Sequence, residues 1–296
     1  AIKRYARENN KPWVRVISCS ENEIPDPQIP PHLSGCGEND SECFSAYQNH
    51  FNEVIQPIHD RFNAFLAECG EAAYPVGEFF EASPHMNLLL YPEPVKFNRS
   101  TPLDPEQFQY LEGCVRDEES YEVPEFKAHN DAPLLYVSFG SLGSGDTGLL
   151  KRLMDVVSTM PVRALFNVGD YESEYDTVPD NVHIASWYPQ PSVISQADAV
   201  IHHGGNNSFN ECLYFGKPAI IMPYVWDGHD NAKRVAETGH GHHLHRNHWK
   251  PKELRATIES MLSNKAMHER LAATSDHMRS EHGPTKAAAI LSGLLD

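Results

Sequence analysis

The 296-residue sequence has neither a surplus of basic residues nor a long apolar run. It carries 41 acidic and 24 basic side chains, which give a formal net charge of −17. Nucleic-acid binding depends on clustered Lys and Arg, so this balance argues against a nucleic-acid partner. A transmembrane helix needs about 20 consecutive apolar residues, whereas the longest runs, MNLLLY and PAIIMPYV, have the length of a strand. We therefore expect no transmembrane segment.

Several catalytic and cofactor motifs are also missing. The sequence has no G-x-S-x-G, the turn that carries the nucleophile of α/β-hydrolases, so a serine hydrolase is unsupported. The segment GSLGSG at 140–145 has its glycines in the order G-x-x-G-x-G, which differs from the dinucleotide-binding G-x-G-x-x-G, and no P-loop lysine follows it. We interpret this segment as a turn whose backbone approaches a phosphate.

The six cysteines form no C-x-x-C pair and show no zinc-ligand spacing. We expect free thiols and a cytoplasmic location, because cytoplasmic thiols stay reduced. A loop disulfide between Cys36 and Cys43 is the alternative. The segment GHGHHLHRNH at 239–248 is rich in histidine, but the alternation of a strand would send its side chains to opposite faces. No metal site is therefore expected there.

Residues 121–296 alternate short apolar runs with amphipathic segments. The apolar runs predict strands at 133–141, 163–169, 181–187, 199–203, 217–224 and near 240–246. Between the first two, Leu149, Leu150, Leu153, Met154 and Val157 recur with helical spacing. Strands separated by helices predict a parallel sheet with helices on both faces. We therefore expect an α/β, doubly wound, Rossmann-like C-terminal domain.

Residues 1–120 show fewer elements. We expect strands at 11–19 and 86–92, and between them a helical stretch at 46–69 that is interrupted by Pro57. Prolines and acidic residues dominate 92–132, which predicts a loop running into an interdomain linker with the boundary near 116–132. Two strands are too few for a self-contained sheet. Since the sequence also lacks an initiator methionine, we expect a truncated N-terminal domain.

A polar stretch, HHGGNNSFNE at 202–211, directly follows the apolar strand ADAVI. In open parallel sheets, ligands bind beyond the carboxyl ends of the strands. Gly205 would let the backbone approach a ligand, and the helix starting near Asn207 and Ser208 would present free N–H groups to a phosphate. His203 adds a donor that can carry charge, and Glu211 could accept hydrogen bonds from sugar hydroxyls. The alternative is a satisfied strand end followed by an ordinary helix cap.

The run from 187 to 235 resembles the donor-binding signature of UDP-sugar-dependent glycosyltransferases of the GT-B fold, of the plant secondary-product and bacterial macrolide type. The matches are W-x-P-Q from Trp187 to Gln190, H-x-G-x-N-S-x-x-E from His203 to Glu211, G-x-P at 216–218, and P-x-x-x-D ending at Asp227. Upstream, YVSFGSLGS resembles the first strand of the family's second domain. The resemblance implies a GT-B fold with an N-terminal acceptor domain.

The resemblance also implies an activity and a set of donor-binding residues. A hexose would pass from a UDP-sugar to a hydroxyl of a small, mostly apolar acceptor, with inversion and without a metal or cofactor. Trp187 would stack on uracil, Gln190 would lie near the base and ribose, and Glu211 would hold the ribose hydroxyls. Asp227 would contact the donor sugar. The residues expected around the diphosphate are Ser141, His203, Gly205, Asn207 and Ser208.

Two features depart from the family pattern. Gly228, followed by His229, stands where the family usually has glutamine after the aspartate, so the donor sugar is not fixed by the motif. The histidine that acts as general base in the family would lie upstream of Ala1, and no catalytic residue is assigned within 1–296. Two other functions remain open: a UDP-sugar-binding subunit that needs a partner chain, and a nucleotide-sugar epimerase of the GT-B fold.

Overall fold

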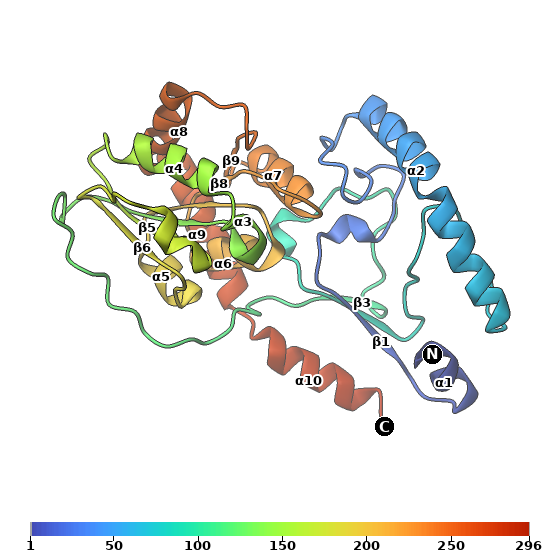
Figure 1. The fold of residues 1–296 in the computed structure, drawn as a ribbon. Helices are drawn as coiled ribbons and strands as arrows, with labels where there is room; N and C mark the ends of the chain where they lie inside the picture. The colour runs from blue at the N-terminus through green and yellow to red at the C-terminus, as the bar shows by residue number, and fades with distance from the viewer. Residues whose placement is uncertain (1, 296) are drawn as a thin grey trace.

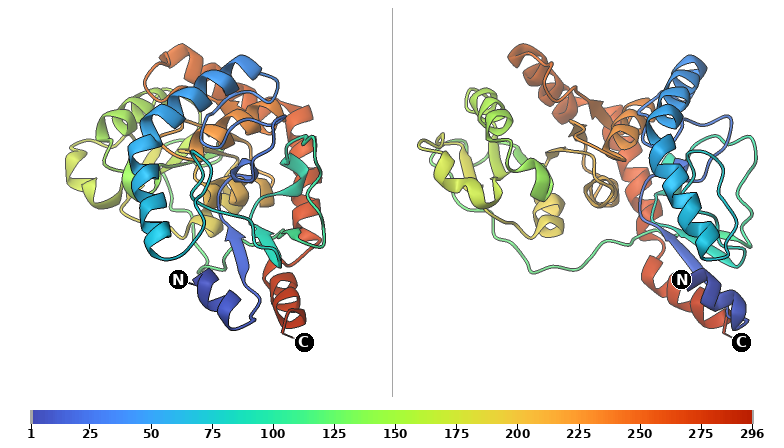
Figure 2. Two further views of the ribbon diagram at one scale, coloured as in Figure 1. Left: turned by 90° about the vertical axis from the view of Figure 1, so that its right-hand side faces the viewer. Right: turned by 45° about the vertical axis from the view of Figure 1, so that its right-hand side comes forward.

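Two parallel β-sheets organise residues 2–295, the part of the chain that the computed structural model describes (Figure 1). The smaller sheet has three strands in the order β1-β2-β3, and the larger has six in the order β6-β5-β4-β7-β8-β9. A long irregular segment joins β3 to β4 and runs around the outside of the molecule (Figure 2). The chain therefore has an N-terminal and a C-terminal sheet.

The C-terminal sheet has the strand order of a doubly wound fold. Its strands are β4 Leu134–Ser138, β5 Arg163–Asn167, β6 Val182–Ala185, β7 Ala199–His202, β8 Ala219–Ile221 and β9 Gly241–His243. All neighbours pair in parallel, and β4 with β7 forms the point where the winding direction reverses. The predicted strands are confirmed, each a few residues shorter than its apolar run.

Helices cover both faces of this sheet. They are α3 Gly140–Gly143, α4 Thr147–Val157, α5 Gln190–Gln196, α6 Asn206–Tyr214, α7 Gly228–Glu237, α8 Pro251–Ser263 and α9 Lys265–Arg279. Helix α8 packs against α4 on one side, whereas α6 packs against α5 and α9 on the other. The side chain of Asp146 caps α4 by accepting a hydrogen bond from the Leu149 amide at 3.0 Å. The apolar positions of α4 that the spacing predicts are all buried.

The N-terminal sheet contains one strand more than the sequence predicts. Its strands are β1 Val14–Ile17, β2 Met86–Leu89 and β3 Phe108–Tyr110. Strand β3 lies in the proline-rich segment that we interpreted as loop, and its three residues are too few for an alternating pattern. The last helix, α10 Gly283–Gly293, returns to this sheet, where Ile290 packs against Leu88 and Leu111. The short helix α1, Ile2–Glu8, precedes β1.

Helix α2 runs without a break from Ser41 to Glu68, so the predicted interruption at Pro57 is wrong. Proline removes one backbone donor and leaves the carbonyl of Glu53 without its helical partner. Both residues are exposed, so water can satisfy that carbonyl. The helix also begins earlier than predicted, because Asp40 caps it by accepting from the Cys43 amide at 3.0 Å. No helix among residues 2–295 is long and apolar enough to cross a membrane.

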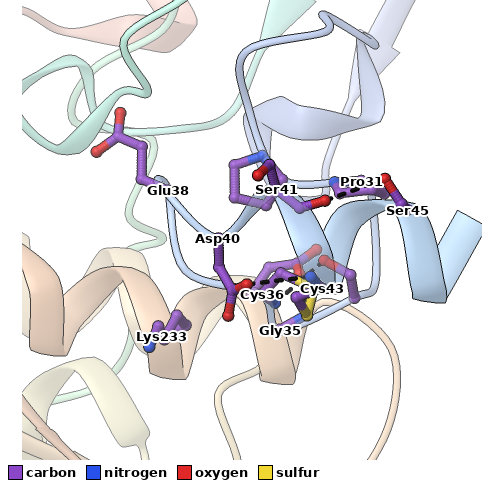
Figure 3. The surroundings of a disulfide bond; sticks show 12 residues. Pro31, Gly35, Cys36, Glu38, Asp40, Ser41, Cys43, Ser45 and Lys233 are labelled. Carbon is purple, nitrogen blue, oxygen red and sulfur yellow. Dashed lines mark hydrogen bonds between the residues drawn. A yellow bond between two sulfur atoms is a disulfide. The ribbon is translucent and has the colours of Figure 1, made fainter.

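Cys36 and Cys43 form a disulfide, so the prediction of six free thiols is wrong for this pair (Figure 3). Cys43 lies on the first turn of α2, and the loop before the helix folds back to bring the two Cα atoms within 5.8 Å. Cys19, Cys69, Cys114 and Cys212 are free. The sequence offers only the seven-residue separation, which does not reveal that the loop reverses direction at the helix start.

Replacing Cys36 and Cys43 together by serine is expected to lower the free energy of unfolding by about 2 kcal/mol, because the bond closes a short loop in the unfolded chain. Urea unfolding followed by circular dichroism measures this change. Cys69→Ser is the matched control, since Cys69 is free and only partly buried. Thiol titration of the denatured, unreduced protein should count four thiols among the six cysteines; a count of six would contradict the disulfide.

The loop that carries the disulfide docks on α7 of the C-terminal sheet. The buried carboxylate of Asp230 accepts hydrogen bonds from the backbone amides of Leu33 at 2.6 Å and Gly35 at 2.8 Å. One turn later, the buried guanidinium of Arg234 pairs with Glu38 at 2.8 Å and donates to the carbonyl of Val95 at 2.7 Å. Buried charges are stable only when they are paired, so these contacts fix the N-terminal segment beside the start of α7.

Candidate functional site

The predicted site residues gather at the carboxyl edge of the C-terminal sheet. Ser141 and His203 follow β4 and β7, the two strands at the point where the winding reverses. Trp187 follows β6, and Asp227 follows β8 at the start of α7. In doubly wound folds this edge is where ligands bind. The sheet thus brings together residues that are up to 86 positions apart in the printed sequence, from 141 to 227.

Two glycines enclose the imidazole of His203. A Cβ atom on Gly205 would lie 2.5 Å from Nε2 of His203, and one on Gly140 would lie 3.0 Å from its Cε1. Neither position leaves room for a side chain, and Gly140 also has a φ of +67°, which favours glycine. The ring therefore lies beside the turn that carries Ser141. Burial lowers the pKa of His203, and a hydrogen bond with the backbone of Ser138 opposes this shift.

His202 has a structural role, in contrast to its neighbour. Its side chain is buried at the end of β7, and its Nδ1 accepts a hydrogen bond from the Gly204 amide at 3.1 Å. Burial lowers the pKa of His202 to about 3. His202 is thus satisfied at Nδ1 only, since its buried Nε2 has no hydrogen-bond partner within the described part of the chain. His203 instead faces the glycines beside β4 and α6.

The amino end of α6 points into the same region. Gly205 precedes the helix and provides no side-chain cap, so the first amides of α6 are open to an acceptor. The carboxylate of Asp227 lies near one of them, and the backbone amide of Asn206 lowers the pKa of Asp227 against the effect of burial. Asn207 is exposed at this end, and Ser208 is buried one residue later. Burial raises the pKa of Asp227 to about 6, and the adjacent Asp230 contributes in the same direction.

A hydrogen-bond network connects three of the predicted residues and adds one that the sequence did not reveal. Nε2 of Gln190 donates to Oε2 of Glu211 at 2.6 Å and lies 3.0 Å from Oγ of Ser208. The other carboxylate oxygen of Glu211 pairs with Nη1 of Arg116 at 2.7 Å. Arg116 belongs to the segment between the sheets, and no motif marks it. Burial raises the pKa of Glu211, while Gln190 and Arg116 oppose this shift.

Two cavities adjoin this network. The first, about 380 Å³, is lined by Ser141, Trp187 and Gln190 and has Arg116 in its wall. The second, about 220 Å³, is lined by Asn207 and Glu211 and also includes Arg116. The indole of Trp187 is 58% exposed, so its face is free to stack on a ligand. Trp187 and Glu211 therefore border a common region rather than opposite sides of the molecule.

The residue that replaces the family glutamine lies in a tight position. A Cβ on Gly228 would lie only 2.6 Å from the carbonyl oxygen of His203, which a real side chain would not tolerate without a backbone shift. The following His229 packs its Cβ 3.0 Å from the Cβ position of Gly35, in the loop that docks on α7. The structure thus gives a steric reason for glycine at 228, and it directs His229 toward the N-terminal segment.

His32, in the loop before α2, lies close to the carboxylate of Asp230 on α7, a contact that the sequence did not suggest. Nδ1 of His32 lies 3.7 Å from Oδ2 of Asp230. Oγ of Ser20 lies between them, 3.5 Å from His32 and 3.3 Å from Asp230. Burial lowers the pKa of His32, and Asp230 counteracts this effect. The two residues are 198 positions apart, so no local motif links them.

Comparison with protein families supports the resemblance seen in the motifs. Residues 151–294 match the family model of the erythromycin biosynthesis protein CIII-like C-terminal domain. The matched region includes β5 to β9 and every predicted donor-binding residue from Trp187 to Asp227; Ser141 precedes it.

Comparison with individual proteins agrees with the family match. An uncharacterized UDP-glucosyltransferase of Bacillus subtilis, YojK, is 23% identical over 176 residues, which are 56% of this chain and 44% of that protein. The chain thus spans less than half of this relative. The crystal structure of the kitacinnamycin glycosyltransferase superposes with a TM-score of 0.79 at 20% identity, covering 100% of this chain and 73% of that one. The glycosyltransferase VinC, solved in complex with dTDP, gives a TM-score of 0.67 at 18% identity, covering 98% and 68%.

Proposed function

We propose that this chain, which has the fold of the GT-B glycosyltransferases and carries the erythromycin biosynthesis protein CIII-like domain, binds a UDP-sugar and transfers its hexose to a small acceptor. The acceptor would be a hydroxyl of a mostly apolar molecule, and the transfer would invert the anomeric centre. One observation supports this most strongly: Trp187 and Gln190 line one cavity at the reversal point of the sheet, Glu211 lines a second, and the two share Arg116 as a lining residue.

The positions of Trp187, Gln190 and Glu211 define one orientation for a bound uridine nucleotide in this proposal. The indole of Trp187 offers a stacking surface for the base, and Gln190 lies between that surface and Glu211. The two oxygens of Glu211 are acceptors for the vicinal hydroxyls of a ribose. The diphosphate then falls between the turn of Ser141 and the amino end of α6, where backbone amides favour negative charge.

The departure of UDP requires stabilisation of the charge that develops on the diphosphate. Amides of Asn207 and Ser208 and the side chain of His203 are held in place before the reaction, so they cost little reorganisation. In this proposal they replace a metal ion, and no cofactor takes part. As the bond to the hexose lengthens, the anomeric carbon gains oxocarbenium character. Asp227, beside the amino end of α6, would hold hydroxyls of that sugar.

The proposal assigns no general base within residues 1–296. Removing the proton from an acceptor hydroxyl contributes about 10²–10⁴ in rate, so the base determines whether this chain acts alone or needs further residues or a partner chain. A binding subunit remains compatible with the donor site, and so does an epimerase. Incubation with UDP-glucose in the absence of an acceptor distinguishes an epimerase from a transferase. Formation of a new UDP-hexose would contradict the transferase function.

The prediction of a cytoplasmic location rested on reduced thiols. The disulfide between Cys36 and Cys43 removes that support, because disulfides persist mainly in oxidising compartments. The location therefore stays a prediction that the cysteines no longer favour.

Calorimetry with UDP and with ADP tests the donor site directly. We expect UDP to bind at least tenfold more tightly than ADP, since Trp187 and Gln190 carry a signature that resembles that of UDP-sugar-dependent enzymes and line one cavity. Trp187→Ala should weaken UDP binding by about tenfold, because stacking of a base on an aromatic side chain contributes about 1–3 kcal/mol. Trp226→Ala is a matched control, as Trp226 is also exposed but lies outside this cavity. Equal affinity for UDP and ADP would refute the proposal.

A further inference from the structure

Arg116 pairs with the carboxylate of Glu211, which in the proposed function binds the ribose hydroxyls. Its Nη1 lies 2.7 Å from Oε1 of Glu211, and its Nε pairs with Glu118. The side chain of Glu211 is only 3% exposed, whereas that of Arg116 is 47% exposed. Arg116 therefore reaches from the surface of the segment between the sheets to a buried acceptor. Because it lines both cavities, it lies where a nucleotide must pass or remain.

Each carboxylate oxygen of Glu211 already has one hydrogen-bond donor without a ligand. One oxygen accepts from Arg116 and the other from Gln190. Burying a carboxylate without hydrogen-bond donors costs far more free energy than leaving it in water. A site that relied on ribose alone to satisfy Glu211 would reject any nucleotide lacking the hydroxyl, often by several orders of magnitude. Here a residue of the chain itself supplies the missing donor.

We infer that Arg116 is a specificity-determining residue that lets the site accept both ribo- and 2′-deoxyribonucleoside diphosphates. This inference rests on the proposed function, in which Glu211 faces the sugar of the nucleotide. With UDP, the 2′-hydroxyl replaces Arg116 as the donor to Oε1 of Glu211, and Arg116 moves toward Glu118 and water. With dUDP, Arg116 stays on Glu211, so no buried acceptor loses its partner. The site then discriminates only weakly between ribose and 2′-deoxyribose. Recognition of the nucleotide depends mainly on its base and its diphosphate.

The position of Arg116 suits such an exchange. Its guanidinium offers several donors in a fixed plane, so it can keep Glu118 while it releases Glu211. It belongs to a segment without helix or strand, so its movement breaks no secondary structure. Gln190, by contrast, is tied to Ser208 as well as to Glu211 and starts helix α5. Of the two partners of Glu211, Arg116 is therefore the one whose release costs less free energy.

The ratio of the dissociation constants for dUDP and UDP tests this inference by calorimetry. We expect the wild-type ratio to stay below about tenfold, and we expect Arg116→Met to raise it by about 30-fold through loss of dUDP affinity, the cost of one unpaired buried acceptor. Arg61→Met on α2 is the matched control, because Arg61 is exposed and remote from the cavities. Its ratio should equal that of the wild type.

A double variant makes the test independent of general damage to the site. Adding Glu211→Gln to Arg116→Met removes the charge whose isolation causes the effect, so the ratio should fall back to within about threefold of the wild-type value. If Arg116→Met does not fold, Arg116→Lys is tested instead. We then expect the ratio of the dissociation constants for dUDP and UDP to rise about threefold, because a single ammonium group replaces the several donors of the planar guanidinium.

The outcomes separate the inference from the proposed function. An unchanged ratio in Arg116→Met, or equal losses for UDP and dUDP, would overturn the role of Arg116 while leaving the donor site intact. Wild-type protein that binds neither UDP nor dUDP would overturn the proposed function itself.

Discussion

Replacing Glu211 by alanine is expected to weaken UDP binding by about 100-fold. Two charge-assisted hydrogen bonds to the ribose hydroxyls would be lost. Each contributes about 1.5–3 kcal/mol net of solvent, and the release of Arg116 from Glu211 offsets part of this gain. The substitution would also leave Gln190 and Arg116 without their common acceptor. Isothermal titration calorimetry with UDP measures the loss, and dUDP should lose less because it has one hydroxyl fewer.

A surface glutamate on another helix provides the control for this variant. Glu259 lies exposed on α8, so Glu259→Ala changes the same residue type in the same secondary structure. It should bind UDP as the wild type does. If Glu211→Ala kept its affinity for UDP within threefold while its circular dichroism spectrum stayed native, Glu211 would not be a ribose ligand, and the orientation of the nucleotide would have to be abandoned.

Introducing the family glutamine at position 228 is expected to damage the site instead of completing it. The Cβ of Gly228→Gln would lie 2.6 Å from the carbonyl oxygen of His203, so either α7 or the β7 end must move. We expect a loss of about 2 kcal/mol in unfolding free energy, together with UDP binding weakened by at least tenfold, because His203 and the amino end of α6 shift together. Thermal unfolding and calorimetry measure the two effects.

Gly293 offers the matched control for this substitution. A Cβ there meets no atom within 4 Å, and the residue lies near the end of α10. Gly293→Gln should change neither stability nor UDP affinity. Tighter binding of UDP-glucose by Gly228→Gln would mean instead that a glutamine fits at the sugar and that the contact between Gly228 and His203 is readily relieved.

Local patterns predicted those elements whose buried positions show in the sequence as a continuous apolar run or as helical spacing of apolar residues. The apolar run before His203 and the helical spacing of Leu149 and Leu153 identify β7 and α4, because each pattern reports burial directly. The three residues of β3 and the continuity of α2 through Pro57 could not be read in this way. A short strand has too few positions for alternation, and the tolerance of a proline depends on what surrounds its helix.

Pairs that are distant in the chain escaped prediction for a related reason. Arg116 meets Glu211 across 95 positions, and Asp230 meets Leu33 across 197. The disulfide is closer in sequence, yet it too depends on a reversal of the loop before α2. Sequence spacing constrains neighbours within one element, whereas these partners belong to elements whose relative placement only packing determines.

The order of residues along the chain was enough to predict a doubly wound domain and the edge of the sheet where the proposed donor-binding residues gather, since strand ends follow from apolar runs and polar motifs follow them directly. Tertiary structure alone decided that Arg116 satisfies Glu211, that Gly228 has no room for a side chain, and that the first segment docks on α7. Those outcomes depend on distances between separate elements, which are set by the packing of the whole chain and leave no periodic trace in the sequence.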